Sequence, residues 1–177
     1  MLFSMQFWQL LVLVSQLGMI AAVPNQHAVR NSNTAVAFMK GAGGLKGVFV
    51  FVPEGNTIKM SIEYSGVPEG QSFAYHIHEK AYTNGNCGSG GGFWNPTRST
   101  MKAPGSCVAH APGHCASGDL SGKHGKLVGH GAKSTSLRIF DPSLKITGSS
   151  QGIIGKTLMI HNAEGTPVAC DIIAHKA

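Results

Sequence analysis

Short runs of alternating apolar and polar residues, ended by glycine, proline or asparagine, are the feature that most constrains the fold of this chain. In residues 57–64, Ile58, Met60 and Ile62 alternate with polar side chains. Such a period of two is typical of a strand with one buried face. Further strand-like runs occupy residues 34–40, 45–52, 73–79, 126–130, 136–140, 156–161 and 168–174. They predict an all-β domain, an antiparallel sandwich or barrel, without a long amphipathic helix.

Three histidines suggest a metal site. His76 and His78 are two residues apart in a strand-like run, so their side chains project from the same face. His161 ends another such run and can supply a third imidazole. Imidazoles fixed on strands suit copper or zinc. The spacing is equally compatible with an edge strand that exposes two unrelated histidines.

Residues 80–123 have no periodicity and are rich in glycine. A stretch of this length inside a compact domain is usually functional or disordered. It contains three of the four cysteines, which indicates that it is tied to the domain. The cysteines are Cys87, Cys107, Cys115 and Cys170. An even number allows three pairings, and spacing alone does not choose among them.

The first 22 residues are typical of a secretory signal peptide. Met1 to Ala22 carries no charged side chain and ends in two alanines, so we expect cleavage after Ala22. A membrane anchor is the alternative. The sequence predicts a signal peptide (1–22), a linker (23–33) and the β-domain (34–177). The product is therefore expected to be secreted and extracellular, with no membrane attachment after cleavage. The net charge of +6 comes from scattered residues, which argues against a nucleic-acid partner.

Several motifs follow one another in the order found in copper/zinc superoxide dismutases, which this chain resembles over residues 34–174. They are Ala35-Val36-Ala37-Phe38-Met39-Lys40-Gly41, Gly47-Val48-Phe49-Val50-Phe51, His76-Ile77-His78-Glu79, Gly118-Asp119-Leu120, Ile154-Gly155-Lys156-Thr157-Leu158-Met159-Ile160-His161 and Val168-Ala169-Cys170. The resemblance implies an eight-stranded Greek-key barrel with copper held by His76, His78 and His161. The substrate it implies is superoxide, converted to oxygen and hydrogen peroxide.

The secreted copper-only members are the more similar subfamily. His161 and Cys170 are nine residues apart, which leaves no room for the long charged loop of the two-metal enzymes. The stretch from Cys115 to Gly125 is also similar to that subfamily. Copper is therefore the expected cofactor, and zinc is doubtful. The resemblance implies the disulfides Cys87–Cys170 and Cys107–Cys115.

Three positions depart from the family pattern. Phe93 stands where the family has its fourth copper-ligand histidine, and Pro167 stands where it has an arginine that attracts superoxide. Ala116 replaces a glutamate of the copper-only members. Phe93 and Trp94 are expected to pack over the altered pocket or, alternatively, to form a partner surface. These departures predict weakened or altered dismutase activity; the alternative is a non-catalytic copper-binding or interaction protein on the same barrel.

The irregular segment offers possible substitute ligands. His110 matches a zinc-ligand histidine of the two-metal enzymes, Asp119 matches their zinc-ligand aspartate, and His114 lies nearby. One loop histidine would complete the copper site or form a zinc site with Asp119; alternatively, both histidines are solvated. His124 is expected to form structural hydrogen bonds. The chain is expected to be a monomer or a weak dimer.

Overall fold

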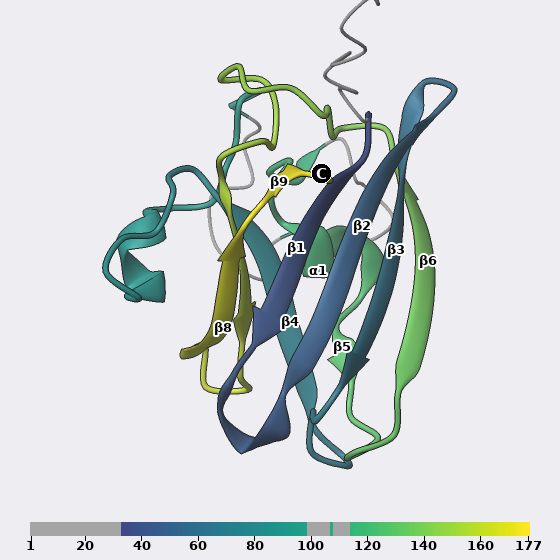
Figure 1. Cartoon of the computed structure of the whole chain (residues 1–177), viewed down its shortest axis with the longest axis vertical. Helices are drawn as coiled ribbons and strands as arrows, with labels where there is room; N and C mark the ends of the chain where they lie inside the picture. Colours follow the sequence, from purple (N-terminus) through teal and green to yellow (C-terminus); the bar gives the residue numbers. More distant parts are fainter. Residues whose placement is uncertain (1–32, 99–106, 108–113) are drawn as a thin grey trace, which may run out of the picture.

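The computed structural model describes residues 33–98, 107 and 114–177 (Figure 1). The predicted signal peptide, 1–22, and the predicted linker up to residue 32 lie outside the described residues. Within the described part of the chain, no helix has the length and apolar character needed to cross a bilayer. The elements in chain order are β1 (Ala35–Lys40), the 3-10 helix η1 (Ala42–Gly44), β2 (Lys46–Glu54), β3 (Thr57–Ser65), β4 (Ser72–His78), the 3-10 helix η2 (Cys87–Gly90), α1 (Leu120–His124), β5 (Leu127–Val128), β6 (Thr135–Asp141), β7 (Thr157–His161), β8 (Pro167–Ile172) and β9 (Ala174–His175).

One sheet has five antiparallel strands in the order β6-β3-β2-β1-β9. Its inner face is built from cross-strand pairs, such as Phe49 opposite Ile62 and Phe51 opposite Met60. These four side chains are at most 2% exposed. Burying each contributes about 1.5–3 kcal/mol of hydrophobic free energy. The alternating pattern read from the sequence therefore faces the core.

The second sheet has four strands in the order β5-β4-β7-β8. Tyr75 and Ile77 of β4 point into the core and are fully buried. His76 and His78 point to the opposite face, yet they are only 7% and 6% exposed. Strand β4 is thus covered on both faces along its second half, as is its neighbour β7 over Thr157–Ile160.

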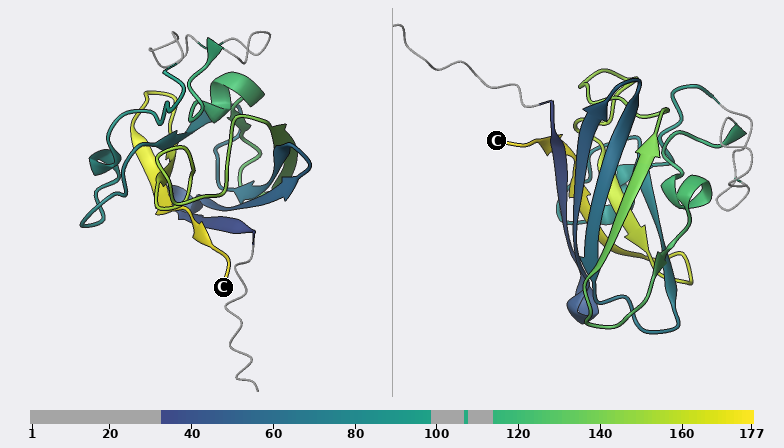
Figure 2. Two further views of the ribbon diagram at one scale, coloured as in Figure 1. Left: turned by 90° about the horizontal axis from the view of Figure 1, so that it is seen from above. Right: turned by 90° about the vertical axis from the view of Figure 1, so that its right-hand side faces the viewer.

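The outer face of β4 is covered by the segments around Phe93 and α1. Trp94 N–H donates to the Ile77 carbonyl, and Ile77 N–H donates to the Gly118 carbonyl. A Cβ at Gly118 would lie 2.3 Å from the Ile77 carbonyl oxygen, so only glycine allows this close approach. Figure 2 shows the two sheets enclosing the core, with α1 outside them on the side away from β1.

Both expected cysteine pairs are bonded in the structure. Cys87 is joined to Cys170 over a sequence separation of 83 residues, and Cys107 is joined to Cys115. The first bond fastens the loop that carries η2, which projects from the barrel in Figure 1, to β8. The second closes a small loop ahead of α1.

The predicted fold class, an all-β Greek-key barrel, is confirmed. The described part of the chain contains nine strands instead of eight, because β9 adds two residues to the edge of β1. The strand predicted at 126–130 is only the two residues of β5. Gly129 follows the strand, with its N–H donating to the Gln71 carbonyl, and a Cβ there would lie 1.8 Å from the Pro68 carbonyl oxygen.

Candidate metal centre

The three predicted histidines converge. His76 and His78 come from β4, and His161 ends β7, whose ladder places it opposite Ala74. One ring nitrogen from each lies within 4.8 Å of the other two. No other group of three histidine, cysteine or acidic residues with this geometry is found among residues 33–98, 107 and 114–177.

Backbone carbonyls fix the tautomers of two rings. The Nδ1 of His78 lies 2.7 Å from the Gly91 carbonyl oxygen, and the Nδ1 of His161 lies 3.1 Å from that of Gly165. A carbonyl only accepts, so each Nδ1 carries the proton and each neutral ring presents a lone pair at Nε2. These two Nε2 atoms face each other at 3.3 Å. Two lone pairs this close repel unless a cation lies beside them.

His76 is held the other way round. Its Nε2 lies 3.4 Å from Asp119 Oδ1 and 3.3 Å from Ser121 Oγ, which makes Nε2–H the donor. Its buried Nδ1 has no hydrogen-bond partner within the part of the chain that the structure describes. An unpartnered buried acceptor is costly and calls for a ligand. The free lone pairs are therefore Nδ1 of His76 and Nε2 of His78 and His161, and this donor set fits copper.

The helix α1 supports His76. Asp119 caps the helix by accepting from Gly122 N–H at 2.9 Å. Ser121 Oγ donates to the Tyr75 carbonyl at 2.8 Å and accepts from Tyr75 N–H at 2.6 Å. The imidazole of His76 is therefore oriented by a residue that caps the helix and a residue that fastens the helix to β4. Such secondary contacts fix the ring plane of a ligating histidine.

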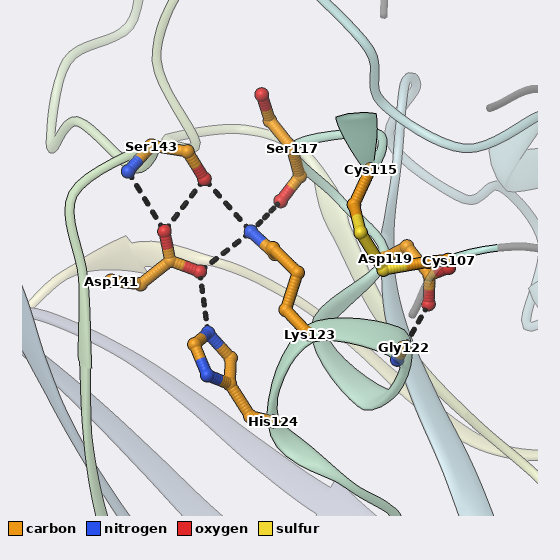
Figure 3. A network of polar contacts seen from close by, with 9 residues as sticks. All are labelled: Cys107, Cys115, Ser117, Asp119, Gly122, Lys123, His124, Asp141 and Ser143. Atoms are coloured by element: carbon orange, nitrogen blue, oxygen red, sulfur yellow. Dashed lines mark hydrogen bonds and ion pairs between the residues drawn. A yellow bond between two sulfur atoms is a disulfide. The ribbon is translucent and has the colours of Figure 1, made fainter. Parts of the chain in front are cut away.

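A buried ion network anchors the other end of α1 (Figure 3). Lys123 Nζ lies 2.6 Å from Asp141 Oδ2 and also donates to the Ser117 carbonyl and to Ser143 Oγ, both at 2.8 Å. His124 Nε2 lies 2.8 Å from the same carboxylate, in agreement with its expected structural role. The helix that orients His76 is thereby fixed to the end of β6.

Phe93 fills one side of the centre. Its ring centroid lies 4.2 Å from that of His76 and 5.5 Å from that of His78. Trp94 points the other way and is 3% exposed, with its indole N–H donating to the Ser150 carbonyl at 3.0 Å. The two aromatics therefore pack on opposite sides of one segment, which favours the packing hypothesis over a shared partner surface.

Burial lowers the pKa of two of the three histidines, His78 and His161. The pKa of His161 falls to about 4. Burial by itself would raise the pKa of Asp119, but hydrogen bonds from His76 and Gly122 bring that pKa below its ordinary value. At neutral pH the carboxylate is ionised and the two imidazoles are neutral, which is the state that binds a metal.

A cavity of about 600 Å³ opens beside the centre. Its lining includes His76, His161, Phe93, Asp119, Ala74 and Lys126. His161 is the partly exposed member of the three histidines, so the cavity reaches the centre from its side.

The substitute ligands proposed from the sequence are placed differently. Asp119 contacts His76 Nε2 instead of joining the three nitrogens. His114 is exposed and outside the group, and His110 lies outside the described residues. Ser121, Lys123 and Asp141 were missed by the sequence interpretation. Asp141 follows a strand-like run, but no local pattern pairs it with Lys123 or places Ser121 beside His76.

Comparison with known proteins identifies the family. The profile of the copper/zinc superoxide dismutase (SODC) family matches residues 45–167, more than half of the chain. The chain belongs to the copper/zinc superoxide dismutase family. This match covers His76, His78 and His161 together with the three departures Phe93, Ala116 and Pro167.

The relatives include cell-surface superoxide dismutases of Candida albicans. Cell surface superoxide dismutase 6 (Cu-Zn) is 30% identical over 174 residues, covering 94% of this chain and 53% of that protein. Cell surface Cu-only superoxide dismutase 5 is 31% identical over 130 residues, covering 71% and 53%. The chain thus spans about half the length of these curated relatives. The solved Cu(II) structure of superoxide dismutase 5 from Candida albicans superposes with a TM-score of 0.69 at 27% identity, covering 82% of this chain and 94% of that one.

Proposed function

We propose that this protein is a secreted, copper-only superoxide dismutase-like protein whose centre binds one copper through His76, His78 and His161, with dismutase activity altered by Phe93. The supporting observation is the convergence of three unshared nitrogen lone pairs beside an open cavity, with a phenyl ring on one side of the centre. The family supports copper and superoxide, and cell-surface relatives support secretion. The signal peptide of residues 1–22 and the linker of 23–33 belong to this proposal.

Bound copper would supply the one-electron chemistry, oxidising one superoxide to oxygen and reducing a second, with two protons, to hydrogen peroxide. The protein holds the imidazoles in place: the carbonyls of Gly91 and Gly165 orient two of them, and Asp119 with Ser121 orients His76. The cavity beside His161 gives a small anion access.

Phe93 changes the site in two ways. Phenylalanine has no lone pair and binds no metal, so the centre has three imidazoles in place of four. It also has no proton to give, and the second half-reaction then takes its protons from solvent in the cavity. A three-imidazole centre with an apolar wall favours Cu(I), which slows the cycle. This same observation supports the second candidate, a copper-holding protein without catalysis.

Restoring the ligand tests the proposal. The ring centroid of Phe93 lies 4.2 Å from that of His76. The imidazole of a histidine at position 93 can therefore reach the same centre. We expect copper-loaded Phe93→His to consume pulse-generated superoxide faster than wild type. Phe93→Leu is the control, since it removes the aromatic ring without adding a ligand, and we expect no gain.

Two results would count against altered catalysis. Wild-type decay already as fast as that of an intact copper-only enzyme would show that Phe93 is tolerated. If superoxide decays at the buffer rate both with copper-loaded wild type and with copper-loaded Phe93→His, the copper-holding alternative is favoured.

A further inference from the structure

The sheet register places a lysine in line with the metal centre. Ala74 of β4 lies opposite His161 of β7 on one side. On its other side β4 pairs with β5, Phe73 opposite Leu127, and continuing this register by one residue places Lys126 beside Ala74. Leu127 is buried in the core, so Lys126 faces outward with Ala74 and His161. Lys126 and His161 are therefore about 10 Å apart, two strand spacings, with only a methyl group between them.

The same row ends at Pro167. His161 lies opposite Pro167 in the β7–β8 ladder, so the order across the sheet is Lys126, Ala74, His161, Pro167. Pro167 stands where the family resemblance expects a cation. The chain has a cation on the other side of the same histidine, where a small residue leaves room for a long side chain.

Lys126 is exposed and available to a ligand. It lines the cavity with Ala74 and His161. Among the described residues, it makes no ion pair and no side-chain hydrogen bond, in contrast to the buried, paired Lys123. The carboxylate in the cavity wall, Asp119, faces His76 and Gly122 N–H. Glu164 of the β7–β8 hairpin is exposed and is not among the residues that line the cavity.

We propose that Lys126 is a positioning residue that attracts small monovalent anions into this cavity and holds them beside the open side of the metal centre. This inference rests on the proposed copper function. Lys126 neither binds the metal nor transfers a proton; it raises the local concentration of the anion. A unit charge about 7–10 Å from the anion, at an effective dielectric constant between about 40 and 80, changes its affinity about two- to eightfold.

Azide binding to the copper(II)-loaded protein tests the role without turnover. Azide is a monovalent anion, and its binding to Cu(II) is followed by its charge-transfer absorbance. We expect Lys126→Ala to weaken azide binding about two- to eightfold at low ionic strength, and Lys126→Arg to retain wild-type affinity. Lys133→Ala is the matched control, because Lys133 is exposed, lies outside the cavity lining and gives the same change of net charge.

The ionic strength adds a second readout. Raising it from about 0.01 to 0.15 M shortens the screening length from about 30 to 8 Å, and the difference between wild type and Lys126→Ala should shrink. Equal azide affinity of copper-loaded Lys126→Ala and Lys133→Ala would overturn the role of Lys126 but leave the proposed copper function standing. A wild-type protein that takes up no copper would overturn the proposed function and this role with it.

Discussion

Removing one partner of the buried pair between Lys123 and Asp141 should be among the most destabilising single changes in this protein. The side chains of these two residues are 3% and 1% exposed. Asp141 accepts from Lys123, from His124 and from both the N–H and the hydroxyl of Ser143. Asp141→Asn would leave the Lys123 ammonium buried without a counter-charge, with only neutral acceptors: the Ser117 carbonyl, the Ser143 hydroxyl and the new amide oxygen.

We expect Asp141→Asn to lower the free energy of unfolding by about 3 kcal/mol, since breaking a buried pair costs about 3–5 kcal/mol and asparagine keeps part of the hydrogen bonding. Lys123→Met should cost less, because the Asp141 carboxylate keeps three of its donors. Urea unfolding of the copper-free protein at pH 7 measures both. An Asp141→Asn variant as stable as wild type, or less destabilised than Lys123→Met, would refute this reasoning.

The stabilisation that the Asp141 carboxylate provides should depend on pH. Burial opposes ionisation of Asp141, but the hydrogen bond from His124 and the charge of Lys123 hold its pKa well below the ordinary value. The stabilisation is therefore present above the unfolded-state pKa of about 4 and is lost as the pH falls further below it. The gap between wild type and Asp141→Asn should narrow between pH 4 and pH 2. A gap that stays constant over this range would show that the charge of Asp141 does not carry the effect.

Two further predictions concern the disulfide and the ligands. The double variant Cys87→Ser, Cys170→Ser should lower the free energy of unfolding by about 4–5 kcal/mol, because the bond closes a loop over 83 residues in the unfolded chain. Chemical denaturation under non-reducing conditions measures this loss, and a loss below about 1 kcal/mol would contradict the prediction. Because the pKa of His161 is held at about 4 by burial, copper should stay bound at about pH 5.5, where a histidine of ordinary pKa is mostly protonated. Metal analysis after dialysis at graded pH measures this, and complete release at pH 5.5 would contradict it.

The strands and the three-histidine site could be predicted from the sequence because each depends on local periodicity. Alternation in residues 57–64 predicted which face of β3 is buried, and the spacing of His76 and His78 predicted their shared face. The position of His161 beside them followed from the family resemblance, since residues on different strands meet only through long-range pairing.

The residues that orient His76 and fix α1 could not be predicted from local periodicity. Asp119 was assigned to a metal by its motif, yet it caps α1 and contacts His76 from the side away from the other two rings. The pairing of Lys123 with Asp141 joins residues from α1 and β6, so no local pattern reports it. Which nitrogen of His76 is free depends on this support, and therefore required the structure.

The copper content of purified, copper-loaded protein tests the central claim most directly. The structure predicts one copper per chain in wild type and in His175→Ala, and a clear loss in His76→Ala and in His161→Ala, each of which removes one of the three converging lone pairs. If His76→Ala and His161→Ala both retained one copper per chain, the metal would be bound elsewhere and the proposed centre would be wrong.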